Sequence, residues 1–339
     1  MGEEDRIRLE QELAGVPFGT LRLEGVCPSE GSAWDAQVDL GSQGRGRGEI
    51  FSLFPGVYLI CHRFLAKRVS FCHPADRSVL EITYCRRGRA GWNLKGGAAV
   101  YLGPGDLFLR TTDCCAGSQM ELPLGCYEGV TVALAQGEGQ GHWPAVLEEA
   151  GVTLEELCRI YCGEGQPAVL PASYELEEIF APLYRQPPAL RLPYCRLKVQ
   201  ELLLYLWGRG REAARGTGRH LWGQAQQIRE IHELLVQNLD RRFTIEELSR
   251  RYLIDASSLK RGFKAVYGQP IASYMKEYRV RRAMELLRTT GEPIAQIAAQ
   301  VGYESQGKFT RAFQDVTHLL PKEYRKLALT GGAPARTPK

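Results

Sequence analysis

The chain has 339 residues, of which 44% are hydrophobic and 24% are charged. A chain of this length exceeds one ordinary hydrophobic core, so we expect two domains. No apolar stretch approaches the ~18 residues of a membrane-spanning helix. The first residues, MGEEDRIRLEQELAG, are acidic where a secretion signal requires an apolar segment. We therefore expect a cytoplasmic protein without a membrane partner.

The charge is distributed unevenly along the chain. Residues 225–326 contain 18 Lys and Arg against 12 Asp and Glu, whereas residues 1–224 have a net charge of −4. A basic C-terminal part attached to an acidic N-terminal part predicts a polyanionic partner for the C-terminal part alone.

The first 135 residues contain a lead-in segment and then a β-rich region. Residues 1–50 are charged and Gly-rich, and the stretch GSQGRGRGE is more typical of a solvated or poorly ordered loop than of a nucleic-acid contact. Residues 51–135 contain short β-branched and aromatic runs separated by Gly, Pro and Asp, which predict a small β-barrel or β-sandwich. Its interior either holds one small molecule or is filled by side chains.

Helical spacing begins at residue 143 and continues to residue 207. In YCRLKVQELLLYLW, apolar residues recur at the spacing of an amphipathic helix. These residues are Cys195, Val199, Leu202, Leu203 and Leu206. Because the stripe packs either on the β-rich region or on a second subunit, residues 51–207 are predicted to form a sensor domain that can also form a homodimer. Residues 208–223, rich in Gly and Arg, are predicted to be the interdomain linker.

Two helix pairs follow each other in residues 224–328, before a short tail at 329–339. Thr244 and Glu247 have the spacing of a capping box, and Asp255 is expected to begin the second helix of the first pair. The apolar residues expected to bury the second helix of each pair repeat after 50 positions, and they are Leu259 and Phe263, then Phe309 and Phe313. Two short helices joined by a tight turn, twice in one chain, are typical of a protein that reads the DNA major groove.

The outer faces of these second helices carry small polar, amide and basic side chains. They are Ser257, Lys260, Arg261 and Lys264 in the first pair and Gln306, Lys308 and Arg311 in the second. We expect Arg261 and Arg311 to contact guanine through two hydrogen bonds each, which provides about 1–3 kcal/mol of discrimination. The lysines, together with Arg281 and Arg282, are expected to contact phosphates or to remain in solvent.

Four stretches of the C-terminal part, SSLKRGFKAVYG, ASYMKEYRVRRAMELLRTT, IAQIAAQVGYESQGKFTRAF and PKEYRK, together resemble a known family. From about Ala225 to Arg325 the chain is similar to the DNA-binding domain of the AraC/XylS transcription regulators. The form LKRGFK is also similar to the branch that contains siderophore-responsive regulators.

The resemblance implies an α+β two-domain protein. Its C-terminal all-α domain has two helix-turn-helix units joined by a linker helix, and a cupin-like sensor and dimerisation domain precedes it. The implied partners are double-stranded DNA, RNA polymerase and a small-molecule effector, with no cofactor. The base-contacting positions of the family fall on Ser257, Lys260 and Arg261, then on Gln306, Gly307 and Arg311.

The sequence departs from the family at two places. Gly307 has no side chain with which to read a base. His318 and Leu320 stand where the family usually has Gly and Thr, which puts the geometry of the last turn in question but not the fold.

We therefore expect a sequence-specific DNA-binding regulator, more often an activator than a repressor, that responds to a ligand. An enzyme is not expected, because no Ser-His-Asp order, phosphate loop or paired carboxylates stand out.

Two alternatives use the ten cysteines, which we expect to be reduced and mostly buried. A redox-sensing regulator would use Cys114 and Cys115, expected in a loop, or Cys158 and Cys162, which share one helical face. A metal sensor would use the pairs Cys61–His62 and Cys72–His73. Neither pair has the spacing of a structural zinc site. A cupin-type enzyme fused to a DNA-binding domain is a further alternative, although the sequence has no His-x-His of the kind that a metal-binding cupin enzyme displays.

Overall fold

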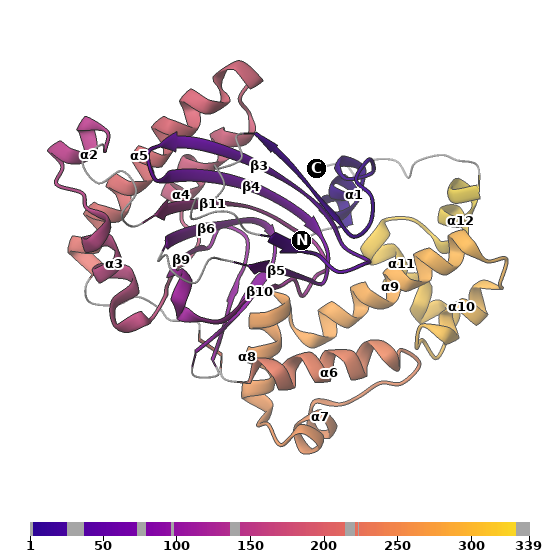
Figure 1. The fold of residues 1–339 in the computed structure, drawn as a ribbon. Helices are drawn as coiled ribbons and strands as arrows, with labels where there is room; N and C mark the ends of the chain where they lie inside the picture. The colour runs from indigo at the N-terminus through magenta and orange to yellow at the C-terminus, as the bar shows by residue number, and fades with distance from the viewer. Residues whose placement is uncertain are drawn as a thin grey trace. The chain divides into compact units, whose positions relative to one another are not determined.

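The computed structural model describes residues 3–25, 37–72, 79–95, 98–135, 143–213, 221–222 and 224–329. The chain separates into two compact units, Met1–Gly223 and Gln224–Lys339, called unit 1 and unit 2 below (Figure 1). Unit 1 contains β-strands followed by helices, and the described part of unit 2 is helical. The predicted fold class is therefore confirmed.

Unit 1 has regular structure within the predicted lead-in segment. It begins with helix α1 (Glu3–Glu12) and strands β1 (Thr20–Gly25), β2 (Gln37–Asp39) and β3 (Arg45–Phe54). The expectation of a loop at residues 41–49 is wrong from Arg45 onward. In β3 glycines occupy buried positions that alternate with partly exposed charged residues, and a Cβ on Gly46 would lie 2.6 Å from the ring of Phe64. Close packing, and not flexibility, accounts for these glycines.

Two sheets pack face to face in unit 1. The remaining strands are β4 (Val57–Leu65), β5 (Arg68–Cys72), β6 (Val79–Gly88), β7 (Ala90–Leu94), β8 (Ala99–Leu102), β9 (Leu107–Thr111), β10 (Cys115–Glu121), β11 (Tyr127–Ala135), β12 (Ala168–Leu170) and β13 (Leu221–Trp222). One sheet has the order β1-β3-β4-β11-β6-β9-β12 and the other β13-β8-β7-β10-β5-β2. Aromatic and sulfur side chains from both sheets, including Phe64, Trp92 and Met120, fill the space between them.

Helices cover the outer face of the seven-stranded sheet (Figure 1). They are α2 (Ala145–Glu149), α3 (Leu154–Cys162), α4 (Tyr174–Phe180) and α5 (Pro188–Ala213), with the short 3-10 turns η1 (Thr112–Cys114), η2 (Gly163–Gly165) and η3 (Ala181–Tyr184) nearby in the chain. Strand β12, which pairs with β9, lies between α3 and α4, where the sequence predicts only helices. The apolar stripe of α5, from Cys195 to Leu206, is buried in the core that the helices share with the seven-stranded sheet. The stripe therefore packs within unit 1.

The predicted linker at 208–223 begins inside a helix. Helix α5 continues to Ala213, because Gly210 is buried and packs against Ile160 of α3. Residues 214–220 and 223 of that linker lie outside the described residues.

Unit 2 contains the two predicted helix pairs. Its helices are α6 (Ala225–Gln237), α7 (Ile245–Tyr252), α8 (Ala256–Tyr267), α9 (Ile271–Thr289), α10 (Ile294–Gln300), α11 (Gln306–Thr317) and α12 (Pro321–Leu329). The long helix α9 runs from α8 at one end to α10, α11 and α12 at the other (Figure 1). Within the described residues, no helix combines the length and the apolar character needed to cross a membrane.

Candidate nucleic-acid interface and a polar cavity

The first helix pair begins with the predicted capping box. The Thr244 hydroxyl accepts a hydrogen bond from the Glu247 backbone N–H at 3.1 Å, and the Glu247 carboxylate accepts one from the Thr244 N–H at 2.8 Å. Asp255 then caps α8 by accepting a hydrogen bond from the Ser258 N–H at 2.8 Å. Hydrogen bonds from Ser258 and Ser257 lower the pKa of Asp255 to about 2. Both caps fix where α7 and α8 begin.

The outer face of α8 carries the residues that the sequence predicts. Ser257, Lys260, Arg261 and Lys264 are exposed, whereas Leu259 and Phe263 are fully buried. The Ser257 hydroxyl donates to Asp255 Oδ1 at 2.9 Å, and Arg261 Nη2 donates to Ser258 Oγ at 3.3 Å. The described residues offer Lys260, Arg261 and Lys264 no ion-pair partner, so their charge is directed to solvent.

Helix α11 has a similar buried face and a less positive outer face. Phe309 and Phe313 are fully buried, and Gln306, Gly307, Lys308 and Arg311 are exposed. Lys308 Nζ lies 2.6 Å from Glu304 Oε2, and this hydrogen bond lowers the pKa of Glu304. Lys276 of α9 forms an ion pair with Asp315 of α11 at 2.8 Å, and it lowers the pKa of Asp315. Sequence reasoning missed both carboxylates.

The two departures from the family pattern have clear local consequences. No heavy atom lies within 4 Å of the position of a Cβ on Gly307, so the missing side chain leaves open space. His318 has φ +58°, and its N–H donates to the Gln314 backbone oxygen at 2.8 Å. The turn after α11 is therefore closed by a left-handed residue even though that residue is not glycine.

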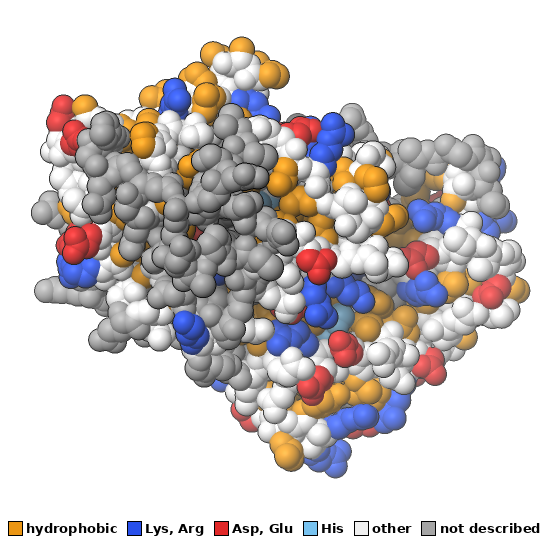
Figure 2. Space-filling model, in the orientation of Figure 1, with side chains coloured by type: hydrophobic (Ala, Val, Ile, Leu, Met, Phe, Trp, Pro, Cys, Tyr) orange, Lys and Arg blue, Asp and Glu red, His pale blue; other side chains and the backbone are white. Residues whose placement is uncertain are grey.

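Arg281 and Arg282 of α9 each have a contact within unit 2. Arg282 forms an ion pair with Glu285 at 2.7 Å, and the Arg281 guanidinium carbon lies 5.8 Å from the centre of the Tyr278 ring. Figure 2 shows Lys and Arg interspersed with Asp and Glu over the visible face of unit 2. Among the predicted contact residues of α8 and α11, those without an ion pair in the described structure are Lys260, Arg261 and Lys264 of α8 and Arg311 of α11.

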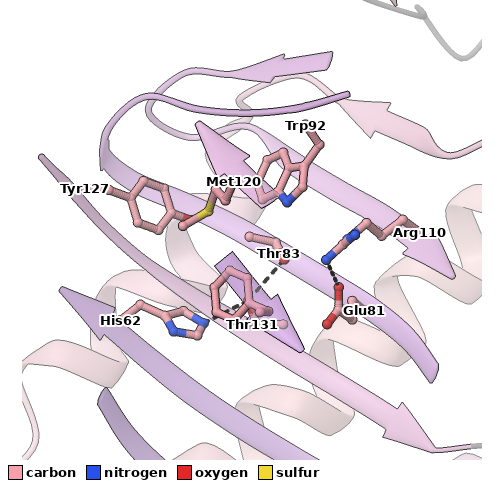
Figure 3. Close-up of a pocket in the computed structure, with 9 residues that line it drawn as sticks. His62, Glu81, Thr83, Trp92, Arg110, Met120, Tyr127 and Thr131 are labelled. Carbon is pink, nitrogen blue, oxygen red and sulfur yellow. Dashed lines mark hydrogen bonds and ion pairs between the residues drawn. The ribbon is translucent and has the colours of Figure 1, made fainter. Parts of the chain in front are cut away.

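A second candidate site is a small cavity of about 30 Å³ in unit 1 (Figure 3). This volume is sufficient for about one or two water molecules. The lining residues are His62, Phe71, Glu81, Thr83, Trp92, Arg110, Met120, Tyr127 and Thr131. The sequence analysis missed this site, although Glu81 and Arg110 are charged residues in otherwise apolar strand patterns.

The cavity has both apolar and polar walls, and several of its polar side chains are paired with each other. Arg110 forms a buried ion pair with Glu81 and lies 5.7 Å from the centre of the Trp92 ring. Thr131 is within hydrogen-bonding distance of His62 Nε2 at 3.0 Å and of the Thr83 hydroxyl at 3.1 Å, and burial lowers the pKa of His62 to about 4.

Tyr127 is fully buried, and its hydroxyl has no hydrogen-bond partner among the described residues. A Cβ on Gly129 would lie 2.2 Å from that hydroxyl, so the glycine makes room for the phenol. This hydroxyl is therefore a buried polar group that is available for a further hydrogen bond.

Only the Cys61–His62 pair lies fully within the described residues. The described residues contain no group of three or more His, Cys, Asp and Glu placed to hold a metal ion. His73 lies outside those residues. Burial, then the Cys195 and Glu49 charges, raises the pKa of Cys61 to about 12, and burial raises the pKa of Cys195 to about 11.

The expectation of a loop at Cys114 and Cys115 is wrong, because Cys114 ends η1 and Cys115 begins β10. Cys162 is buried, whereas Cys158 is partly exposed. The raised pKa values of Cys61 and Cys195 keep those thiols protonated near neutral pH.

Unit 2 contains a match to a known protein family. Residues 248–327 match a family described as a helix-turn-helix domain. The chain is 30% identical over 104 residues to the HTH-type transcriptional activator RhaR of Mannheimia succiniciproducens, a match that covers 31% of this chain and 38% of that protein. It is 28% identical over 104 residues to the multiple antibiotic resistance protein MarA of Escherichia coli, which covers 31% of this chain and 82% of that protein.

A solved transcriptional regulator from Chromobacterium violaceum, with an AraC-type DNA-binding domain, is 24% identical, with a TM-score of 0.30. That similarity covers 32% of this chain and 98% of the other. The chain spans less than half the length of the first curated relatives it matches. The match to the helix-turn-helix family, residues 248–327, begins in α7 and ends in α12. It therefore includes residues of both helix pairs. Residues 248–327 of unit 2 therefore form a helix-turn-helix domain of the AraC type.

Proposed function

We propose that this chain is a sequence-specific transcription regulator that binds double-stranded DNA through unit 2. Helices α8 and α11 would enter two successive segments of the major groove. The observation that carries this proposal is the exposed face of α8 and α11, each held outward by two fully buried side chains beneath it.

Within these helices, we assign different tasks to different residues. Arg261 and Arg311 are the candidates for guanine contacts, with Ser257 and Gln306 beside them as smaller polar readers. Lys260, Lys264 and Lys308 are the candidates for phosphate contacts, which add affinity but no sequence information. Ser257 would have to exchange its hydrogen bond to Asp255 for one to a base.

The direction of regulation proposed here is activation. The names of two relatives, the transcriptional activator RhaR and the F1 operon positive regulatory protein of Yersinia pestis, describe positive regulators. An activator of this kind would act by contacting RNA polymerase.

Unit 1 would supply the response to a small molecule. The polar cavity between its sheets is the candidate site, and its charges are balanced by the Glu81–Arg110 pair. A neutral polar effector would leave no uncompensated buried charge there, whereas an ion would. At about 30 Å³ the cavity must widen to admit more than water, and the flexible Met120 side chain is its most adaptable wall.

Unit 1 also carries the surface that we propose for a homodimer. An open groove of about 870 Å³ lies along α2, α4 and α5. At its edge Tyr174 is 75% exposed and Leu197 is 63% exposed. Large apolar side chains exposed along one groove are the feature that favours a protein contact here. Native mass spectrometry of the full chain, and of Leu197→Glu, tests this: a monomer in both would remove the dimer.

The redox alternative is less favoured because thiol sensors need accessible cysteines. Of the predicted sensor thiols, Cys114 and Cys162 are buried and Cys158 is partly exposed. Titration of the thiols with and without an oxidant, compared with DNA affinity, separates the two mechanisms. Metal analysis of the purified protein tests the metal sensor and the cupin-type enzyme together.

The deciding experiment is selection of DNA from a random pool by the full chain, followed by affinity measurements at several salt concentrations. We expect one enriched motif with two conserved segments, bound about 10³-fold or more tightly than random DNA. Enrichment of no motif, with equal affinity for all sequences, would contradict the proposal.

A further inference from the structure

A contact between the two helix pairs lies at residues 238–244, the loop between α6 and α7. The turn that follows α10 packs directly on this loop, because a Cβ on Gly302 would lie 1.9 Å from the Leu239 carbonyl oxygen. Gly302 also has φ +80°, a conformation that glycine adopts without steric cost. A larger residue at this position would force the turn and the loop apart.

The same loop is held from α9 by Arg279. This side chain is 9% exposed, and its Nη2 donates to the Arg241 carbonyl oxygen at 3.0 Å. The guanidinium carbon lies 3.2 Å from the position of a Cβ on Gly302. Arg279 therefore lies beside the turn of the second pair while binding the loop that leads into the first.

Arg279 is an unusual choice for a residue that only fills space. It has no ion-pair partner within the described part of the chain, and its Nε has no hydrogen-bond acceptor there. Burial and then the charge of Arg242 lower the pKa of Arg279. An apolar side chain would fill the same volume without a buried unpaired charge, so the hydrogen bond to the loop is what the arginine contributes.

An ion pair between α9 and α11 is a weaker polar link. The side chains of Lys276 and Asp315 are 41% and 52% exposed, and ion pairs in solvent contribute little. The contact made by Gly302, Arg279 and residues 238–244, which we call the junction, is the buried connection between the first pair and the turn of the second.

We propose that the junction fixes the orientation of α11 relative to α8, and thereby the distance between the two DNA segments that the chain accepts. This inference rests on the proposed function, in which both helices enter DNA. Successive major-groove segments on one face of DNA are one helical turn apart, about 34 Å. When α8 and α11 are held rigidly, a shift of one DNA segment relative to the other removes the base contacts of one helix. When the two helices can move relative to each other, both can keep their base contacts after the shift.

The test compares DNA spacing with and without the junction. One probe is the DNA motif selected by the full chain. The other probes are the same motif with one or two base pairs inserted between its two segments. The Kd for each probe is measured by fluorescence anisotropy. For the unsubstituted chain we expect each insertion to weaken binding at least about tenfold, because one helix loses its base contacts. For Arg279→Met and Gly302→Ala we expect weaker binding at the native spacing but a loss of less than about threefold on insertion.

Matched controls are Arg288→Met, an exposed arginine on the same helix, and Gly291→Ala, where no heavy atom lies within 4 Å of the added Cβ. Both should keep the spacing penalty of the unsubstituted chain. Circular dichroism reports the folded fraction of each variant. If Gly302→Ala does not fold, Arg279→Met decides the question, because it removes a hydrogen bond without adding a clash.

One result would overturn the junction proposal. It is an unchanged spacing penalty in folded Arg279→Met, that is, a loss of affinity by the same factor at every spacing, which a purely structural role predicts. Absence of any DNA binding by the unsubstituted chain would instead remove the proposed function, and the spacing inference with it.

Discussion

The two helix pairs of unit 2 share one plan but use their left-handed turn residues differently. In the first pair Leu253 has φ +51° and is 90% exposed. In the second pair Gly302 has φ +80° and is enclosed against the Leu239 carbonyl. A left-handed residue can carry a side chain where that side chain points into solvent, but glycine is required where another backbone approaches.

The outer faces of the two pairs also differ in charge. The basic residues of α8 have no carboxylate partner among the described residues, whereas Lys308 of α11 is paired with Glu304. We therefore expect the first pair to supply most of the general attraction to phosphate and the second to depend more on base contacts.

The largest expected difference concerns the two turns. Gly302→Ala should lower the stability of unit 2 by at least about 2 kcal/mol, because the left-handed conformation alone costs an L-residue roughly 1–2 kcal/mol and the Cβ also overlaps a carbonyl. Leu253→Ala should change stability by less than about 1 kcal/mol, since its side chain is in solvent. Calorimetry of the full chain measures both, and similar losses in the two variants would break the comparison.

The next effect concerns base reading by α11. Arg311→Ala should lower affinity for the selected motif by about 1–3 kcal/mol and change affinity for random DNA much less. Equal losses on both DNAs would show that Arg311 holds a phosphate instead.

The helix caps should respond differently to acid. Because the pKa of Asp255 is lowered from 3.8 to about 2, its contribution to stability is complete above about pH 4 and is lost as the pH falls through about 2. The cap of α11, Ser305, does not titrate in this range. Thermal unfolding from pH 7 to pH 2 should show the difference between the unsubstituted chain and Asp255→Asn shrinking below pH 4, while the effect of Ser305→Ala stays constant.

The smallest effect concerns single phosphate contacts. Lys264→Ala should reduce the slope of log affinity against log salt by about one unit. Lys308→Ala should reduce it by less, because Glu304 already neutralises much of that charge. An unchanged slope for Lys264→Ala would place this lysine away from the DNA.

Local patterns predicted unit 2 well. The capping box at Thr244, the cap at Asp255 and the buried pairs Leu259–Phe263 and Phe309–Phe313 are all present. These features depend on residues within a few positions of each other, so spacing alone identifies them. Glu304 and Asp315 were missed because apolar periodicity says nothing about which charges meet on a surface.

Unit 1 was harder to predict because its determinants are distant in sequence. The glycines of β3 imitate a loop in composition, yet they are buried against β4. The sequence pattern ended the helix at residue 207, whereas α5 ends at Ala213. The contact of Gly210 with Ile160 of α3 cannot be predicted from a Gly- and Arg-rich stretch.

The sequence by itself determined that this chain has an N-terminal β-rich part and a C-terminal pair of capped helix pairs with basic outer faces, because hydrophobic period and capping are local properties. Only the tertiary structure decided that Glu81 meets Arg110 inside the sandwich, that Gly302 approaches Leu239, and that Arg279 holds the loop between α6 and α7. Each of these contacts joins segments at least 29 residues apart, and no short pattern specifies which distant backbone or charge a buried side chain will meet.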